Sequence, residues 1–272
     1  MSLGALIGLV GIDVDGTLVG AGGRIAPGVW EAVARARSAG VHLALCSGRP
    51  AFGVALTYAR QLEVDGWHVF QNGASVVHLG SGESRSVPLP PQALQALITE
   101  ARTTGNVLEL YSDTEYVTES TADLAREHAE LLGLSYEPRP FESLADPVVR
   151  AQWVLPGAEA KRVMSAGQPG LEMAQSTSPL MPGTQFVGLT HAGVSKGAAL
   201  RAVAAEYGVT LDEVMYVGDA GNDLSALRIV GHPVAMANAD PLVLAATAIH
   251  VGHVDEGGLA EALEQATATR GA

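Results

Sequence analysis

The sequence predicts an α/β fold, with a Rossmann-like core built on a doubly wound parallel sheet and an α+β cap domain inserted into that core. Short uncharged apolar runs alternate with amphipathic stretches over residues 1–80, and the same alternation returns over residues 190–272. Between them, residues 81–189 lose the apolar runs and gain prolines and short segments of alternating hydrophobicity. A chain of 272 residues is long enough for two domains. We therefore expect a core of residues 1–80 and 190–272 and a cap of residues 81–189.

The first core segment predicts the order strand, helix, strand, helix, strand. Residues 6–12 are apolar, include β-branched side chains and carry no charge, which is typical of a parallel strand covered on both faces. A helix is expected over 27–39, because a proline stands near its first turn and a glycine just past its end. Apolar runs at 41–46 and 68–70 predict two further strands, with a helix from about residue 50 to 62 between them. This order predicts parallel pairing.

The middle segment predicts a mixture of helices and strands. Apolar residues recur at helical spacing over 92–103, and Gly133 ends a second expected helix over 121–132. Alternating segments at 107–111 and 151–155 predict strands. We expect glycines near residues 80–82 and at 188 to act as hinges for this domain.

The last segment returns to the α/β pattern. A helix is expected over 196–207 and a strand over 214–217. Further short strands are expected at 234–236 and 248–251, and a closing helix at 258–268.

Composition excludes several classes of partner. A formal net charge of −13 argues against binding to nucleic acid and to an anionic membrane surface. The apolar N-terminal run is too short to span a bilayer and lacks a basic region before it, so we expect neither a signal peptide nor a membrane anchor. The single cysteine, Cys46, cannot form an internal disulfide and fits a reducing, cytoplasmic location. We interpret Cys46 as a buried core residue.

Polar side chains follow the predicted core strands or begin the helix after the cap. In chain order they are Asp13, Asp15, Ser47, Lys196, Asp219, Asn222 and Asp223. In open α/β sheets, ligands bind beyond the carboxyl ends of the strands. Two unpaired carboxylates at a buried strand end cost several kcal/mol each in desolvation, which a divalent cation would offset. An all-oxygen ligand set suits Mg²⁺.

These residue types together predict phosphoryl transfer. A carboxylate can attack phosphorus and form an aspartyl phosphate, provided that a cation and a lysine screen the repulsion between the two anions. A second carboxylate two residues away can protonate the leaving oxygen and later accept a proton from water. The serine hydroxyl and nearby backbone amides can bind the phosphoryl oxygens.

Four motifs in this order resemble the haloacid dehalogenase superfamily, and within it the Cof-type phosphatases with a type IIB cap. The motifs are Asp13-Val-Asp-Gly-Thr17, Ser47-Gly-Arg-Pro50, Lys196-Gly197 and Gly218-Asp-Ala-Gly-Asn-Asp223. Further similar segments are Gln71-Asn-Gly-Ala74, Ala235-Met-Ala-Asn-Ala239 and Asp255-Glu-Gly-Gly258. The resemblance covers nearly the whole core, whereas the cap matches in position and approximate size.

The resemblance implies a role for each site residue. Asp13 would be the nucleophile and Asp15 the general acid and base. Mg²⁺ would be held by the Asp13 side chain, the Asp15 backbone carbonyl and Asp219, with Asp223 and Asn222 nearby or acting through water. The phosphate would be bound by four residues, namely Ser47, Gly48, Lys196 and Asn222. Arg49 is either a residue that braces the turn or a substrate contact, and the sequence leaves both open.

We therefore expect a Mg²⁺-dependent phosphatase that hydrolyses small phosphomonoesters, with sugar phosphates or similar polar metabolites as the substrate class. A phosphomutase of the same superfamily is the alternative. A dehalogenase fits less well, because Asp15 supplies an acid and base that displacement of a halide does not require. A binding module without activity would have no need for both carboxylates and the lysine. The sequence does not indicate the oligomeric state.

Overall fold

The structure is a computed structural model that describes residues 6–178 and 180–268. Its internal contacts divide the chain into two units. The core unit comprises residues up to Arg49, Thr57–Arg85 and residues from Ser195 onward, and the cap unit comprises Pro50–Leu56 and Ser86–Val194. None of the described helices is both long and apolar enough to cross a membrane.

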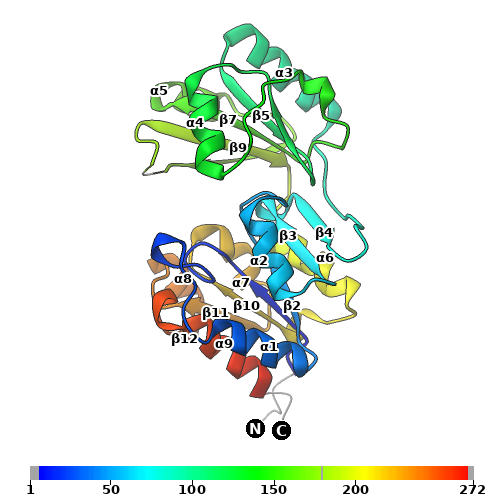
Figure 1. Ribbon diagram of the computed structural model, residues 1–272, viewed down its shortest axis with the longest axis vertical. Coiled ribbons are helices and arrows are strands. Elements are labelled where there is room, and N and C mark those ends of the chain that lie inside the picture. Colours follow the sequence, from blue (N-terminus) through cyan, green and yellow to red (C-terminus); the bar gives the residue numbers. More distant parts are fainter. Residues whose placement is uncertain (1–5, 179, 269–272) are drawn as a thin grey trace. The chain divides into compact units, whose positions relative to one another are not determined.

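The core unit contains a five-stranded sheet in which every pair of neighbours is parallel, which confirms the predicted fold class (Figure 1). Strand β1 (Leu9–Ile12) lies between β10 (Val214–Gly218) and β2 (His42–Leu45). Beyond β10 come β11 (His232–Met236) and β12 (Ile249–Val251). The fully buried Leu9, Val10 and Ile12 show why β1 is central, since only an uncharged strand can be covered on both faces.

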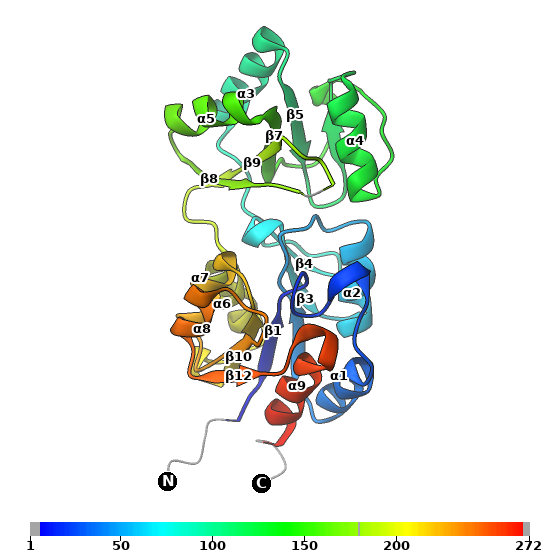
Figure 2. The same ribbon diagram turned by 90° about the vertical axis from the view of Figure 1, so that its left-hand side faces the viewer.

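Helices cover both faces of this sheet (Figure 2). On one face, α1 (Val29–Ser38) packs against α9 (Gly258–Ala268). The other face is covered by α6 (Lys196–Glu206), α7 (Leu224–Leu227) and α8 (Pro241–Ala246). The α6 side chains Leu200 and Val203 are fully buried in that layer. Helix α2 (Val54–Leu62) is divided between the two units: its residues up to Leu56 belong to the cap unit and those from Thr57 onward belong to the core unit.

The third core strand departs from the expected parallel arrangement. Strand β3 (Trp67–Phe70) pairs antiparallel with β4 (Ser75–His78), and it adjoins β2 through a single parallel bridge between Cys46 and Val69. The chain reverses at residues 71–74, where an Asn-Gly pair supplies the turn, a sequence that favours tight hairpins.

The cap unit is an antiparallel sheet with helices on both faces. The strand order is β6 (Tyr116–Thr118), β5 (Val107–Tyr111), β7 (Arg150–Pro156), β9 (Thr184–His191) and β8 (Leu171–Ser176). Helices α3 (Pro91–Thr104) and α5 (Gly157–Ala166) contribute Leu97, Ile98, Ala160 and Val163 to one apolar cluster. Helix α4 (Asp123–Leu132) packs Ala125 into a second cluster with Val107, Val154 and Phe186 of the sheet.

The expected hinge at Gly188 is wrong. Gly188 lies inside β9, where it is paired with Gln152 of β7 on one side and with Ala174 of β8 on the other. A backbone position held in two strand ladders cannot absorb a large change in φ and ψ without breaking them. The glycine instead leaves room beside its Cα, where a Cβ atom would lie 3.4 Å from Nε of Arg150.

Candidate active site

The polar loops of the core meet at the carboxyl edge of its sheet. Asp13 directly follows the central strand β1, and Asp219 directly follows β10, the neighbour of β1 on one side. Ser47 comes two residues after β2, the neighbour on the other side. Because parallel strands end at the same edge, three segments far apart in the sequence converge there.

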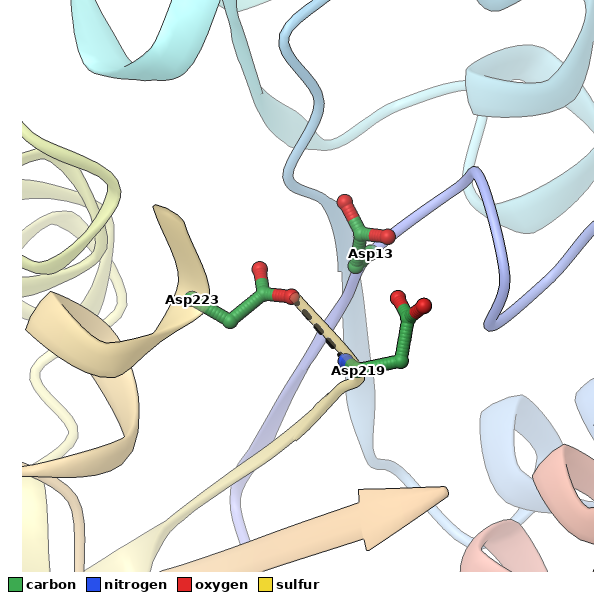
Figure 3. Close-up of side chains that lie close together, drawn as sticks. All are labelled: Asp13, Asp219 and Asp223. Carbon is green, nitrogen blue, oxygen red and sulfur yellow. Dashed lines mark hydrogen bonds between the residues drawn. The ribbon is translucent and has the colours of Figure 1, made fainter. Parts of the chain in front are cut away.

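Three carboxylates of this edge lie close together (Figure 3). Asp13, Asp219 and Asp223 each offer an oxygen atom within 4.8 Å of the others. Asp13 is 6% exposed and Asp223 is fully buried, whereas Asp219 is half-buried. Clustered oxygen ligands of this kind could hold a hard divalent cation such as Mg²⁺ or Ca²⁺.

Lys196 supplies the positive charge that the cluster contains. It is the first residue of α6, is 1% exposed, and places its Nζ 2.5 Å from Oδ1 of Asp13 and 2.8 Å from Oδ1 of Asp223. The helix begins here because the Ser195 hydroxyl accepts a hydrogen bond from the Ala198 N–H. Burial alone would lower the pKa of Lys196, but the carboxylates of Asp13 and Asp223 raise it above its ordinary value. The ammonium therefore stays charged.

The cluster retains an excess of negative charge. Three carboxylates against one ammonium leave a formal charge of −2. Burial and the neighbouring carboxylates of Asp223 and Asp219 raise the pKa of Asp13, against the opposing effect of Lys196. Burial and Asp223 raise the pKa of Asp219 to about 6. A divalent cation would match the charge that the protein leaves unbalanced, so the donor set and its charge fit such an ion.

Asp223 is held by four hydrogen-bond donors. Its Oδ1 accepts from Lys196 and from the Tyr216 hydroxyl, the latter at 2.6 Å, while its Oδ2 accepts from the N–H groups of Asp219 and Ala220, each at 3.0 Å. These bonds fold the Gly218–Asp223 loop around the carboxylate and fix Lys196. Tyr216 was not predicted as a site residue, because it lies within an apolar strand that shows no polar pattern.

A steric constraint explains why the first motif has a glycine at position 16. Gly16 has a φ of +93°, and a Cβ atom built on it would lie 2.1 Å from Oδ2 of Asp219. Any larger residue would displace that carboxylate. The next residue, Thr17, donates its hydroxyl to Oδ1 of Asp219 at 3.2 Å, so the loop after β1 also orients the Asp219 side chain.

Asp15 lies apart from the three clustered carboxylates. Its side chain is 59% exposed and receives two hydrogen bonds from the Arg49 guanidinium. These hydrogen bonds to Asp15 are the main cause of the raised pKa of the Arg49 guanidinium. The sequence left Arg49 open as a residue that braces the turn or as a substrate contact; in the structure its side chain instead binds Asp15, the predicted acid and base.

The predicted phosphate-binding residues surround a turn. Ser47 is fully buried, and its hydroxyl accepts a hydrogen bond from the Arg49 N–H at 3.0 Å. Gly48 lies against the side chain of Asn72, which in turn accepts a hydrogen bond from the amide of Asn222 at 2.9 Å. Asn72 was not predicted as a site residue, although the segment that contains it was one of the motifs carrying the resemblance.

Cys46 is buried in the core, as predicted. Its side chain is inaccessible to solvent, and burial raises the pKa of its thiol to about 12. A thiol in this state is a poor nucleophile, so Cys46 does not compete with Asp13 for that role.

Comparison with known proteins agrees with these motifs. A model of the haloacid dehalogenase-like hydrolase family matches residues 10–263. The chain is 26% identical over 286 residues to 5-amino-6-(5-phospho-D-ribitylamino)uracil phosphatase YwtE of Bacillus subtilis, covering 94% of this chain and 96% of that protein.

Solved structures show the same fold. A haloacid dehalogenase-like hydrolase from Bacteroides thetaiotaomicron has a TM-score of 0.80 at 27% identity, over 95% of this chain and 99% of that one. The subclass IIB sugar phosphatase BT4131 has a TM-score of 0.77 at 24% identity, over 94% of this chain and 98% of that one. Both alignments include the cap as well as the core. With the family model spanning nearly the whole chain, the protein belongs to the haloacid dehalogenase-like hydrolases, and within them it is a Cof-type phosphatase, a phosphoric monoester hydrolase.

Proposed function

We propose that this protein is a Mg²⁺-dependent phosphatase of small phosphomonoesters that works through a phosphorylated Asp13. The observation that carries the proposal is the position of Asp13, whose carboxylate ends the central strand, contacts Lys196 at 2.5 Å and shares one cluster with Asp219 and Asp223. A carboxylate fixed in this way is oriented for attack, and the nearby lysine reduces the repulsion between it and an incoming phosphate.

The reaction would proceed in two displacements. In the first, a carboxylate oxygen of Asp13 forms a bond to phosphorus while the bond to the ester oxygen breaks, and Asp15 gives that oxygen a proton. In the second, Asp15 removes a proton from water, which attacks the same phosphorus and releases inorganic phosphate with a free Asp13. Both carboxylate oxygens of Asp15 accept a hydrogen bond from the Arg49 guanidinium. At least one of these hydrogen bonds must therefore break or be shared before Asp15 can exchange a proton with the substrate or with water.

Mg²⁺ is the cation we propose for the cluster. The ion would be held by the side chains of Asp13 and Asp219 and by the backbone carbonyl of Asp15. Asp223 would lie nearby or act through water. When bound, the ion would neutralise charge on the transferring phosphoryl group. The site has oxygen ligands and a formal charge of −2, which supports a divalent ion.

The phosphate would be bound by four residues, namely Ser47, Gly48, Lys196 and Asn222. Each lies on a loop or at the start of a helix at the carboxyl edge of the core sheet. These residues would therefore contact the phosphate group and little else of the substrate. We propose that the cap, residues 81–189, selects the rest of the substrate, and that residues 1–80 and 190–272 supply the chemistry.

Phosphorylated sugars or sugar alcohols are the proposed substrate class. YwtE is named for a substrate that carries a phosphorylated ribityl group, and BT4131 is described as a sugar phosphatase. Both names support a polar, polyhydroxylated metabolite over an aromatic or lipid phosphate.

Phosphate release from p-nitrophenyl phosphate, with and without Mg²⁺, tests the activity, and a panel of phosphorylated metabolites tests the substrate class. We expect turnover that requires the metal and a preference for sugar phosphates. Asp13→Asn should keep the fold and lose turnover, because an amide is a poor nucleophile. Turnover by Asp13→Asn near the wild-type rate, or trapping of phosphate on another residue, would contradict the proposal.

A further inference from the structure

The turn between β3 and β4 has an unusual backbone. Within the part of the chain that the structure describes, Gln71 and Asn72 are the two non-glycine residues with a left-handed φ, at 51° and 56°. Such conformations cost about 1–3 kcal/mol each and persist where the surroundings hold them in place. Asparagine tolerates this region better than most residues, whereas glutamine has no such advantage.

The surroundings that hold this turn are segments of the candidate active site. The N–H of Gln71 donates to the carbonyl of Arg49, and the N–H of Asn72 donates to the carbonyl of Ser47, both at 2.9 Å. On the other side, Gly73 approaches the start of α6 so closely that a Cβ atom would lie 2.3 Å from the carbonyl oxygen of Ser195. The turn is therefore wedged between the Ser47 loop and the residue that precedes Lys196.

The Asn72 side chain links two of the proposed phosphate-binding residues. Its Oδ1 accepts a hydrogen bond from Nδ2 of Asn222 at 2.9 Å. The same amide lies against Gly48, where a Cβ atom would be 3.2 Å from Oδ1. Asn222 is exposed, so this hydrogen bond is a contact that can limit the rotation of its amide.

We infer that Asn72 is a positioning residue of the phosphate site, which orients the Asn222 amide and supports the backbone of Gly48. This inference rests on the proposed function. Donors fixed before the substrate arrives stabilise a transferring phosphoryl group better than donors that must be ordered during the reaction. The strained turn is the structural means of bringing the Asn72 amide to that place.

The variant Asn72→Gly tests the effect of the Asn72 side chain separately from that of the backbone turn. Glycine adopts a φ of 56° without strain, so the turn should persist while the amide is lost. We expect kcat/KM for p-nitrophenyl phosphate to fall about tenfold and inhibition by inorganic phosphate to weaken by a similar factor, which is the usual effect of one lost hydrogen bond. The melting temperature should stay the same or rise. A role confined to stability would instead lower the melting temperature and leave the kinetic constants unchanged.

A double-mutant cycle tests whether Asn72 acts through Asn222. Asn222→Ala and the double variant Asn72→Gly/Asn222→Ala should lose similar amounts of kcat/KM, because removing Asn72 matters little once its partner is gone. Asn106→Gly is the matched control, since it deletes an amide that donates to Glu159 in the cap, and it should leave the kinetics unchanged.

Three outcomes would overturn the inference. Kinetics for Asn72→Gly within about twofold of wild type, or losses that multiply fully in the double variant, would show that Asn72 does not position Asn222. Failure of the wild-type protein to hydrolyse any phosphomonoester would instead remove the proposed function, and the inference with it. The wild-type assay therefore distinguishes the two failures.

Discussion

Arg49 donates two hydrogen bonds to the carboxylate of Asp15, from Nε to Oδ2 at 2.9 Å and from Nη2 to Oδ1 at 2.5 Å. The planar guanidinium matches the two carboxylate oxygens, so it fixes the orientation of the Asp15 side chain. Arg49 is also the last residue of its core segment before the chain enters the cap unit at Pro50. The proposed acid and base is thus held by the last residue of the first core segment.

Arg49→Lys should reduce turnover most for substrates with poor leaving groups. Lysine keeps the positive charge and loses the paired geometry, so Asp15 would be less well oriented. We expect a loss of roughly tenfold with a sugar phosphate and a smaller loss in the phosphorylation step with p-nitrophenyl phosphate, whose leaving group needs little protonation. Single-turnover measurements with both substrates decide this.

Asp15→Asn provides the reference for that comparison. It should lose about 10²–10⁴-fold with a sugar phosphate, the usual range for a general acid and base, and less in the first step with the aryl ester. If Arg49→Lys shows equal defects for both leaving groups while Asp15→Asn does not, Arg49 acts on the substrate and not through Asp15.

The three polar loops that follow the core strands could be predicted from the sequence because each is a local signal. An apolar strand that ends in carboxylates or a serine indicates its own position, and parallel pairing then brings the loops to one edge. The partners of these residues could not be predicted in the same way. The hydrogen bond between Asn72 and Asn222 joins positions 150 residues apart, and Tyr216 looks like any other core residue of its strand.

Fewer elements of the cap than of the core could be predicted from the sequence, again for physical reasons. Strand β8 is mostly exposed and has no strong apolar run, and helix α5 begins at a glycine without a side-chain cap, so neither was predicted. The hinge expected at Gly188 was wrong because a lone glycine says little about pairing, and here it lies in the middle of a sheet.

Asp219→Ala should raise the Mg²⁺ concentration required for half-maximal activity, because it removes one carboxylate from the proposed ligands. A metal titration of phosphate release measures this, with the exposed Asp212→Ala as the matched control. An unchanged Mg²⁺ requirement in Asp219→Ala would exclude the residue from the metal site.

Lys196→Met should destabilise the protein even without substrate. The substitution leaves the carboxylates of Asp13 and Asp223 in a buried site without the ammonium that contacts both. Breaking a buried ion pair in this way costs about 3–5 kcal/mol. Urea unfolding measures the change, and the exposed Lys161→Met serves as control. A free energy of unfolding equal to that of the wild type would mean that the pair does not stabilise the fold.

His68 should make the fold sensitive to mild acid. Its ring is fully buried, Nδ1 accepts a hydrogen bond from the Leu45 N–H at 3.0 Å, and Nε2 donates to the carbonyl of Glu63 at 2.7 Å, which together require the neutral form. Burial lowers the pKa of His68 from 6.5 to about 4. Between these values the unfolded chain binds a proton that the folded chain excludes, so the contribution of His68 to the free energy of unfolding falls as the pH drops from about 6.5 to 4. The full contribution is about 3 kcal/mol.

Urea unfolding of the wild type and of His68→Asn across this pH range measures the effect of His68. The variant should be less stable at neutral pH, because it loses a donor to Glu63, but its stability should depend less on pH, since the titrating ring is gone. His250→Asn, at an exposed position, should retain the wild-type slope. If His68→Asn kept the same slope between pH 4 and 6.5 as the wild type, the acid sensitivity would have to come from other groups, and the neutral buried ring would not be its cause.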